Sequence, residues 1–286
     1  MNNIAKKQNE LEMLQIQYSA RHCYNFAVIL NEISWLLCIV SSIILNLPCV
    51  TDILPRGVAV IGAIIAIVTI AVNYWKKHLI KKGAALKKLF DYKLFAFELL
   101  GDINGFSVND LKISIGKLIT RYPISYQKQI SHSGTDQPNG VKDWYNNIPQ
   151  ELSSQDAIQK CQRENLHFDT SLVAFTQWIY ITVLVLIICA FILFNHTLSY
   201  IDVIINICSM ISLVIKIGTE CLSICKLKIT LNIIKSLSYT NTLEPQVIQK
   251  MIDERRNVDV TIPNIVYKIN SGFLHLSFKN ADSVNI

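Results

Sequence analysis

Four long apolar stretches constrain this chain more than any other feature. They cover residues 33–50, 57–75, 172–194 and 198–217. A helix of about 20 residues spans about 30 Å, which is the thickness of the hydrocarbon core of a bilayer. Charged residues make up only 17% of the chain, below the roughly 25% that is typical of soluble domains. The buried helices of a soluble bundle are rarely so long and uniform, so the sequence predicts an all-α membrane protein with four transmembrane helices in two pairs.

Lysine placement predicts the orientation in the membrane. Residues 76–90, directly after the second apolar stretch, carry lysines at 76, 77, 81, 82, 87 and 88 and no acidic residue. Because positively charged loops stay on the cytoplasmic side, we expect this segment and both termini inside the cell. The formal net charge of +6 fits this topology better than binding to a nucleic acid duplex. The polar residues before the first span do not resemble a signal peptide.

Five segments are expected along the chain. They are a cytoplasmic amphipathic helix at 1–32, a first pair of spans at 33–75, a cytoplasmic helical insert at 76–171, a second pair of spans at 172–217 and a C-terminal helical region with a tail at 218–286.

Local signals refine this division. Apolar spacing predicts one continuous amphipathic helix over residues 4–30. Another helix is expected over 107–121, followed by a loop over 122–142. Ser153 and Asp156 have the spacing of a capping box, which would open a helix that continues into the third span. A further helix is expected from Pro245, and the picture is a helical stalk continuous with the spans.

A polar stripe follows one face of the fourth span and continues to Glu220. Its members recur at steps of three and four residues, and we consider all but Glu220 pore-lining candidates: Asp202, Asn206, Ser209, Ser212 and Lys216. Polar groups that face lipid are costly, so the stripe is expected to face a bundle interior or water. One interpretation is the wall of a pore. The other is hydrogen bonding within a static bundle, with Lys216 and Asp202 reaching the two membrane interfaces.

Enzymatic chemistry finds no support in the sequence. Phosphate-binding glycine loops and the nucleophile motif of hydrolases do not occur, and the six histidines have no metal-ligand spacing. Cys221 and Cys225 lack a second pair that would complete a zinc site, and we interpret the cysteines as packing residues. We therefore expect no metal, no cofactor and no catalytic residues.

Several cytoplasmic motifs occur in an order that resembles a known family. The motifs are KKQNELEMLQIQYSARHCY, LFDYKLFAFELLGDIN, VKDWYNNIP, CQRENLHFDTSL and IDERRNVDVTIPNIVYKI. Together with the two pairs of spans, they resemble a bacterial family of four-transmembrane effectors inferred to form pores, the S-four-TM family, which is related to the SLATT membrane proteins. The matching positions are Gln8, Asn9, Asp91, Tyr92, Asp143, Trp144, Tyr145, Cys161, Gln162, Arg163, Asn165, Asp169, Arg255, Pro263 and Tyr267.

The resemblance implies a role in antiviral defence. Such proteins are thought to act beside synthases of nucleotide second messengers, in the bacterial inner membrane. A cyclic nucleotide or cyclic oligonucleotide would switch a homo-oligomer into a state that disrupts the bilayer and arrests or kills the infected cell. The alternative is a non-conducting membrane sensor or scaffold that recruits a cytoplasmic partner.

Five residues are candidates for contact with the nucleotide. They are Lys142, Trp144, Tyr145, Arg163 and Asn165. Arginine and lysine suit phosphate, and tryptophan or tyrosine suits stacking on a base. The competing interpretation is structural, with Asp143 and Arg163 as an ion pair and Trp144 as an anchor in the core.

Overall fold

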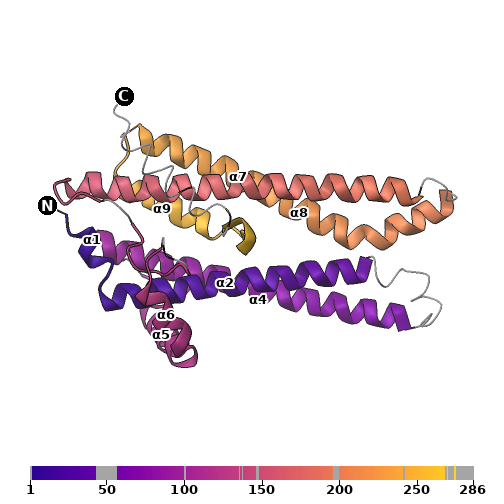
Figure 1. The fold of residues 1–286 in the computed structure, drawn as a ribbon, viewed down its shortest axis with the longest axis horizontal. Coiled ribbons are helices and arrows are strands. Elements are labelled where there is room, and N and C mark those ends of the chain that lie inside the picture. Colours follow the sequence, from indigo (N-terminus) through magenta and orange to yellow (C-terminus); the bar gives the residue numbers. More distant parts are fainter. Residues whose placement is uncertain are drawn as a thin grey trace.

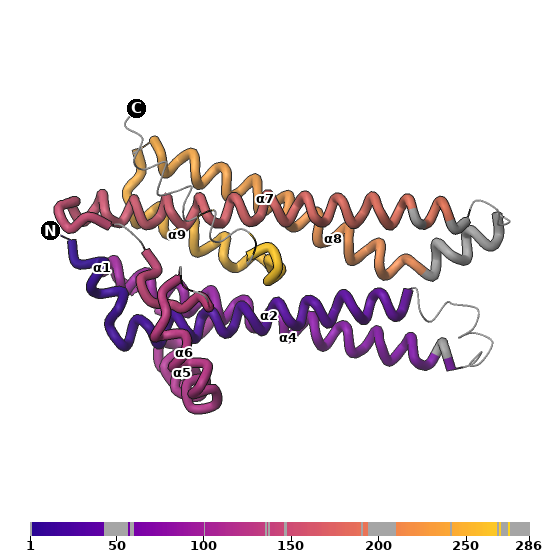
Figure 2. Tube along the Cα trace, in the orientation of Figure 1, coloured from indigo at the N-terminus to yellow at the C-terminus, as the bar shows by residue number. Residues whose placement is uncertain are grey.

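The computed structural model is built of four long helices arranged as two hairpins (Figure 1). It describes residues 2–42, 57–99, 101–134, 136, 138–145, 148–195, 200–240, 242–267, 269 and 274, and the side chains of all of these except 58, 59, 190, 194, 195 and 200–209. The remainder is drawn in grey in Figure 2.

The first hairpin consists of α2 (Leu11–Ser42) and α4 (Gly57–Phe95), and the second consists of α7 (Ser154–Asn195) and α8 (Tyr200–Tyr239). Shorter helices gather at one end of the molecule (Figure 1). They are α1 (Ile4–Lys7), α5 (Val108–Arg121), α6 (Pro123–Ser131) and α9 (Pro245–Arg256). The predicted all-helical class and the pairing of the spans are confirmed.

The long helices extend well beyond a bilayer. α4, α7 and α8 have 39, 42 and 40 residues. At about 1.5 Å per residue they measure about 58 to 63 Å, twice the thickness of the hydrocarbon core. α2, α4 and α7 are long and apolar enough to cross a membrane, while the outer part of α8 lies outside the described side chains. The chain is therefore a multi-pass membrane protein whose spans continue into a helical stalk.

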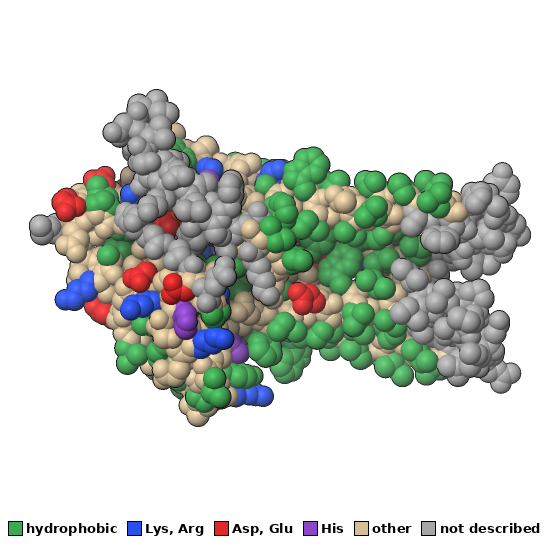
Figure 3. All heavy atoms as spheres, viewed as in Figure 1, with side chains coloured by type: hydrophobic (Ala, Val, Ile, Leu, Met, Phe, Trp, Pro, Cys, Tyr) green, Lys and Arg blue, Asp and Glu red, His purple; other side chains and the backbone are tan. Residues whose placement is uncertain are grey.

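Apolar side chains are exposed along the membrane half of the molecule (Figure 3). On α4, Ile67 is 68% exposed and Ile70 is 71% exposed. Trp75 on α4 and Trp178 on α7 are also exposed, near the ends of their apolar segments. Tryptophan is enriched where a membrane meets water. This surface is what a lipid-facing girdle requires.

The stalk half has two hydrophobic cores. The first joins α2, α4, α5 and the start of α7 and includes Ile16, Phe90 and Leu111. The second joins α7, α8 and α9 and includes Leu166 and Ile252. Both cores cross between the hairpins, because Cys161 of α7 belongs to the first and Trp35 of α2 packs against the second.

The structure confirms some of the predicted local features and contradicts others. The capping box of Ser153 and Asp156 opens α7 as predicted, and the helix expected over 107–121 is α5, which Ser107 caps. The continuous helix over 4–30 was wrong, because α1 ends at Lys7 and α2 begins at Leu11. The loop over 122–142 was partly wrong, because Pro123 takes the first position of α6, where its missing N–H costs nothing.

Candidate functional site

A network of buried polar side chains occupies the centre of the stalk. Asp91 on α4 is 0% exposed. Its carboxylate accepts hydrogen bonds from the hydroxyl of Tyr145 at 3.2 Å, Nε2 of Gln249 at 3.0 Å and Nη1 of Arg256 at 2.6 Å. A buried carboxylate is stable only when it is paired and hydrogen-bonded. We call this group, with the partners described next, the Asp91 network.

The α9 side of the Asp91 network carries a second acid. Asp253 lies 3.2 Å from Nη1 of Arg256 and accepts from Nε2 of Gln249 at 3.1 Å. Burial raises the pKa of Asp253 to about 6, although Arg256 opposes the shift. Burial disfavours the charged form of Arg256, but Asp91 and Asp253 outweigh it and raise the pKa of that guanidinium. Gln162 on α7 donates to Oε1 of Gln249 at 3.1 Å, so the network joins α4, α7 and α9.

The turn between α1 and α2 clamps the loop that carries Tyr145. Gln8 donates to the carbonyl of Tyr145 at 3.0 Å and accepts from its N–H at 2.8 Å. Asn9 makes the same paired contact with Asp143, donating to Oδ1 at 2.6 Å and accepting from its N–H at 2.9 Å. Asp143 has a φ of 48°, a left-handed conformation that these bonds support. These side-chain pairings account for the helix break at residues 8–10.

A second group, of four largely buried side chains and the partly exposed Asp259 (34%), lies where the stalk meets the membrane half. We call Asn31, Lys76, Lys216, Glu220 and Asp259 the boundary cluster. Nζ of Lys216 lies 2.9 Å from Glu220 and donates to Oδ1 of Asn31 at 3.0 Å. Nζ of Lys76 lies 3.1 Å from Asp259, 4.0 Å from Glu220 and 3.4 Å from Asn31. The side chains of Lys76, Lys216 and Glu220 are 5%, 10% and 6% exposed, so these charges are largely removed from water.

The sequence matches a family model described as "SMODS-associating 4TM effector domain" over residues 2–271. The chain belongs to this family. Searches of curated proteins and of solved structures found no match. This 4TM effector is accordingly a membrane effector of nucleotide-signalling defence, as the family description implies.

The motifs that carry the resemblance converge on the Asp91 network. The hydroxyl of Tyr145 accepts from Nδ2 of Asn165 at 2.7 Å and bonds Asp91 in turn. Arg255 forms an ion pair with Asp169, which fastens α9 to α7. Residues that are scattered through the sequence of the 4TM effector thus meet in one place.

The candidate nucleotide contacts do not share one open surface. Tyr145 is buried in the Asp91 network beside Asn165, whereas Lys142 is exposed. Trp144 packs against the first core, with the ammonium of Lys87 3.9 Å from its ring centre. Arg163 donates from Nε and Nη2 to the carbonyl of Ser238, at 3.1 and 2.9 Å, near the end of α8. A nucleotide role for these residues stays a prediction.

The described members of the polar stripe face α2. Oγ of Ser212 lies 2.6 Å from Oγ of Ser42 and 3.4 Å from Oγ of Ser41. Lys216 enters the boundary cluster through Asn31. The side chains of the other pore-lining candidates, Asp202, Asn206 and Ser209, lie outside the described part of the chain.

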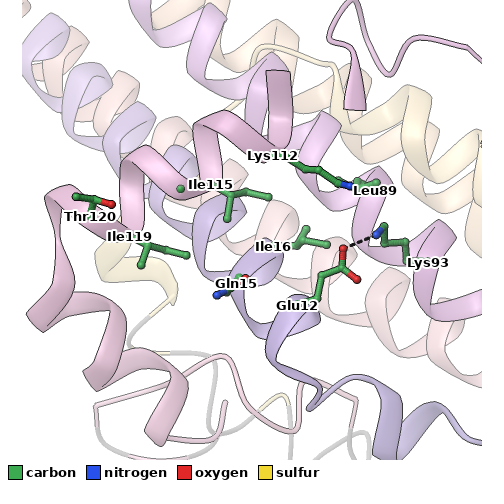
Figure 4. A pocket seen from close by; sticks show the side chains of 10 residues that line it. Glu12, Gln15, Ile16, Leu89, Lys93, Lys112, Ile115, Ile119 and Thr120 are labelled. Atoms are coloured by element: carbon green, nitrogen blue, oxygen red, sulfur yellow. Dashed lines mark hydrogen bonds and ion pairs between the residues drawn. The ribbon is translucent and has the colours of Figure 1, made fainter. Parts of the chain in front are cut away.

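A groove of about 410 Å³ lies between α2, α4 and α5 (Figure 4). Ile16, Leu89 and Ile115 supply apolar surface, while Lys112 and the ion pair of Glu12 with Lys93 supply charge. None of the five candidate nucleotide contacts is among its lining residues. Within the described residues there is also no cluster of three or more His, Cys, Asp or Glu side chains that could hold a metal ion.

Arg256 and Asp259, the charges that complete the Asp91 network and the boundary cluster, were not predicted from the sequence. Arg256 lies 165 residues from Asp91, so no local spacing links them. Glu220 continues the spacing of the polar stripe by one step of four residues, which was the available signal for the boundary cluster. The partners on α4 and beyond α9 could be found only in three dimensions.

Proposed function

We propose that this 4TM effector permeabilises the bacterial inner membrane when a cyclic nucleotide or cyclic oligonucleotide, made by a partner synthase, binds its cytoplasmic part. The activity is non-enzymatic and belongs to a homo-oligomer. Both termini are cytoplasmic, which agrees with α1 and α9 lying in the same half of the molecule (Figure 1). Membership of the family supports a role in nucleotide signalling, and the arrangement of polar side chains supports permeabilisation of the membrane.

One observation carries the proposal. In the described part of the spans, polar groups of α8 are turned toward polar groups of α2 instead of toward lipid, as the contacts of Ser212 with Ser42 and of Lys216 with Asn31 show. A buried polar column of this kind can become wet when helices separate or when copies assemble. In the single chain the described part of this column, at Ser212 and Lys216, is closed by α2.

A static bundle would also explain these contacts, because serine pairs are common between membrane helices. The alternative function is therefore a non-conducting sensor or scaffold. Asn206→Leu combined with Ser209→Leu distinguishes the two. A pore should lose conductance and toxicity, whereas a scaffold should tolerate the change.

Purified protein in liposomes tests the proposal directly. We expect dye or ion leakage that depends on one cyclic nucleotide, with a response that saturates. Arg163→Ala and Lys142→Ala should raise the nucleotide concentration needed for half-maximal leakage if these residues contact phosphate. Protein that never leaks with any cyclic nucleotide tried would overturn the proposal.

A further inference from the structure

The segment that follows α9 bridges the two hairpins. We call residues 257–262 the latch segment. Val258, Val260 and Ile262 pack against the core of α7, α8 and α9. Asp259 instead reaches α4 of the other hairpin, where it lies 3.1 Å from Nζ of Lys76 and 3.8 Å from Nζ of Lys77.

A further hydrogen bond ties the same segment to the chain that follows α4. Nδ2 of Asn104 donates to Oδ1 of Asn257 at 2.9 Å. Arg256, one residue earlier, bonds Asp91 further along α4. α9 and the latch segment therefore hold α4 near its cytoplasmic end and again at the boundary cluster.

Asp259 also balances charge in the boundary cluster. Lys76 and Lys216 place two buried ammonium groups beside Glu220, whose Oε1 lies 2.9 Å from Lys216 and 4.0 Å from Lys76. With Asp259 present, two carboxylates face these two ammonium groups. The side chain of Lys77 is 66% exposed, so its ammonium group remains solvated by water if it loses its contact with Asp259. If Asp259 leaves, the two buried lysines share one carboxylate, and an uncompensated charge in this position is strongly unfavourable.

We propose that the latch segment is an autoinhibitory contact, and that withdrawal of Asp259 from Lys76 releases the two hairpins from each other. This inference rests on the proposed function and adds its regulation. When Asp259 withdraws, the uncompensated positive charge favours hydration of the boundary cluster. Water reaches the cluster when α4 separates from α8. At the boundary cluster, the closed state thus depends on one carboxylate on a segment outside the spans, in addition to the contacts of α2 with α8 and of Arg256 with Asp91.

The test uses full-length protein in liposomes of phosphatidylethanolamine and phosphatidylglycerol, without nucleotide. D259N should raise the basal rate of dye leakage by about tenfold, which corresponds to a shift of about 1.4 kcal/mol toward the open state. Adding K76M to D259N removes the unpaired ammonium and should return leakage to the wild-type rate. E254Q, an exposed change of the same charge in α9, is the matched control and should leave leakage unchanged.

Amide hydrogen exchange of residues 257–262 provides a readout that does not depend on leakage. Exchange should accelerate in D259N and slow again in D259N with K76M. If exchange behaves in this way but no variant leaks and no nucleotide induces leakage, the latch stands and the proposed function fails. If nucleotide induces leakage but D259N matches E254Q in both readouts, the latch is wrong. A D259N protein that aggregates and is not rescued by K76M also overturns the latch, because Asp259 would then serve folding alone.

Discussion

Asp91 shows how one buried side chain organises distant parts of this 4TM effector. It receives a hydroxyl from the 143–145 loop and an amide and a guanidinium from α9. These donors lie on segments that are far apart in the sequence, and no sequence pattern predicts that the segments meet. The residue types were visible in the motifs of the sequence, but their pairing was not, because charge complementarity over such separations has no periodicity.

We predict that Asp91→Asn lowers the free energy of unfolding by about 3 to 5 kcal/mol, because it leaves Arg256 buried with a weaker partner. Chemical denaturation of the detergent-solubilised protein measures this. Glu98→Gln, an exposed change just after α4, should stay within about 0.5 kcal/mol of wild type. Adding Arg256→Met to Asp91→Asn should recover part of the loss, and the absence of any recovery would contradict the ion-pair explanation.

We predict that the folding stability depends on pH in the alkaline range because of the buried Lys87. Its ammonium donates to Gln17 at 2.8 Å and lies over the ring of Trp144. Burial lowers the pKa of Lys87 from 10.5 to about 7, with Asp91 and Asp169 opposing the shift and Arg256 and Arg21 adding to it. Between these two values the unfolded chain binds a proton that the folded chain does not. Folding stability should therefore rise with pH across this window and carry the full cost of the buried charge below pH 7.

Thermal unfolding between pH 7 and pH 10 measures this contribution. The Tm of the wild-type protein should rise more steeply with pH than the Tm of Lys87→Met, which lacks the titrating group. Parallel slopes for the two proteins would show that Lys87 keeps an ordinary pKa in the folded state.

At the scale of elements, helix boundaries could be predicted wherever they depend on local chemistry. The capping residues before α5 and α7 and the proline at the start of α9 marked those helices in the sequence. The break between α1 and α2 could not be predicted, because Gln8 and Asn9 leave the helix to bond a loop more than 130 residues away. Tertiary hydrogen bonds overrode a strong helical periodicity there.

Two helical glycines make a matched pair for a test of α4 and α8. A Cβ added at Gly218, between Lys216 and Glu220, would meet nothing within 4 Å. Gly218→Ala should therefore stabilise α8 by about 0.5 to 1 kcal/mol, since glycine is the less favourable helix former. At Gly83 the added Cβ would lie 3.1 Å from the ring of Tyr24, so Gly83→Ala should gain less or lose stability. Denaturation midpoints measure both, and a larger gain at Gly83 would contradict this expectation.

For the whole molecule, two pairs of spans and a continuous stalk could be predicted because apolar length and lysine placement report directly on the bilayer. The way the hairpins are joined was not predicted. It depends on α2, which contacts α8 through Ser42 and stacks Trp35 on Tyr180 of α7, and on α9, whose Arg256 pairs with Asp91 of α4. Asp91 and Tyr145 stood among the motif positions, but their partners on α9 did not, because only the fold brings them together.

A cross-link between the hairpins should hold the membrane half closed. The hydroxyls of Ser42 and Ser212 lie 2.6 Å apart, so cysteines at both positions should be able to form a disulfide. We predict that the oxidised S42C/S212C protein does not permeabilise liposomes and that reduction restores leakage. S42C alone controls for the native cysteines, including Cys38 one turn away on α2. Equal leakage before and after reduction would show that α2 and α8 need not separate.

The length of α7 has a consequence for how a signal passes from the stalk to the membrane half. α9 grips this helix at Gln162 and Asp169, and the same unbroken helix continues to Asn195. Such a helix resists torsion, so a rotation about its axis at one end is repeated at the other. A rotation of about 100°, the angle between successive residues, would present a different row of side chains to lipid. A helix that rotates as a rigid rod needs no hinge and no separate messenger between the stalk and the membrane half.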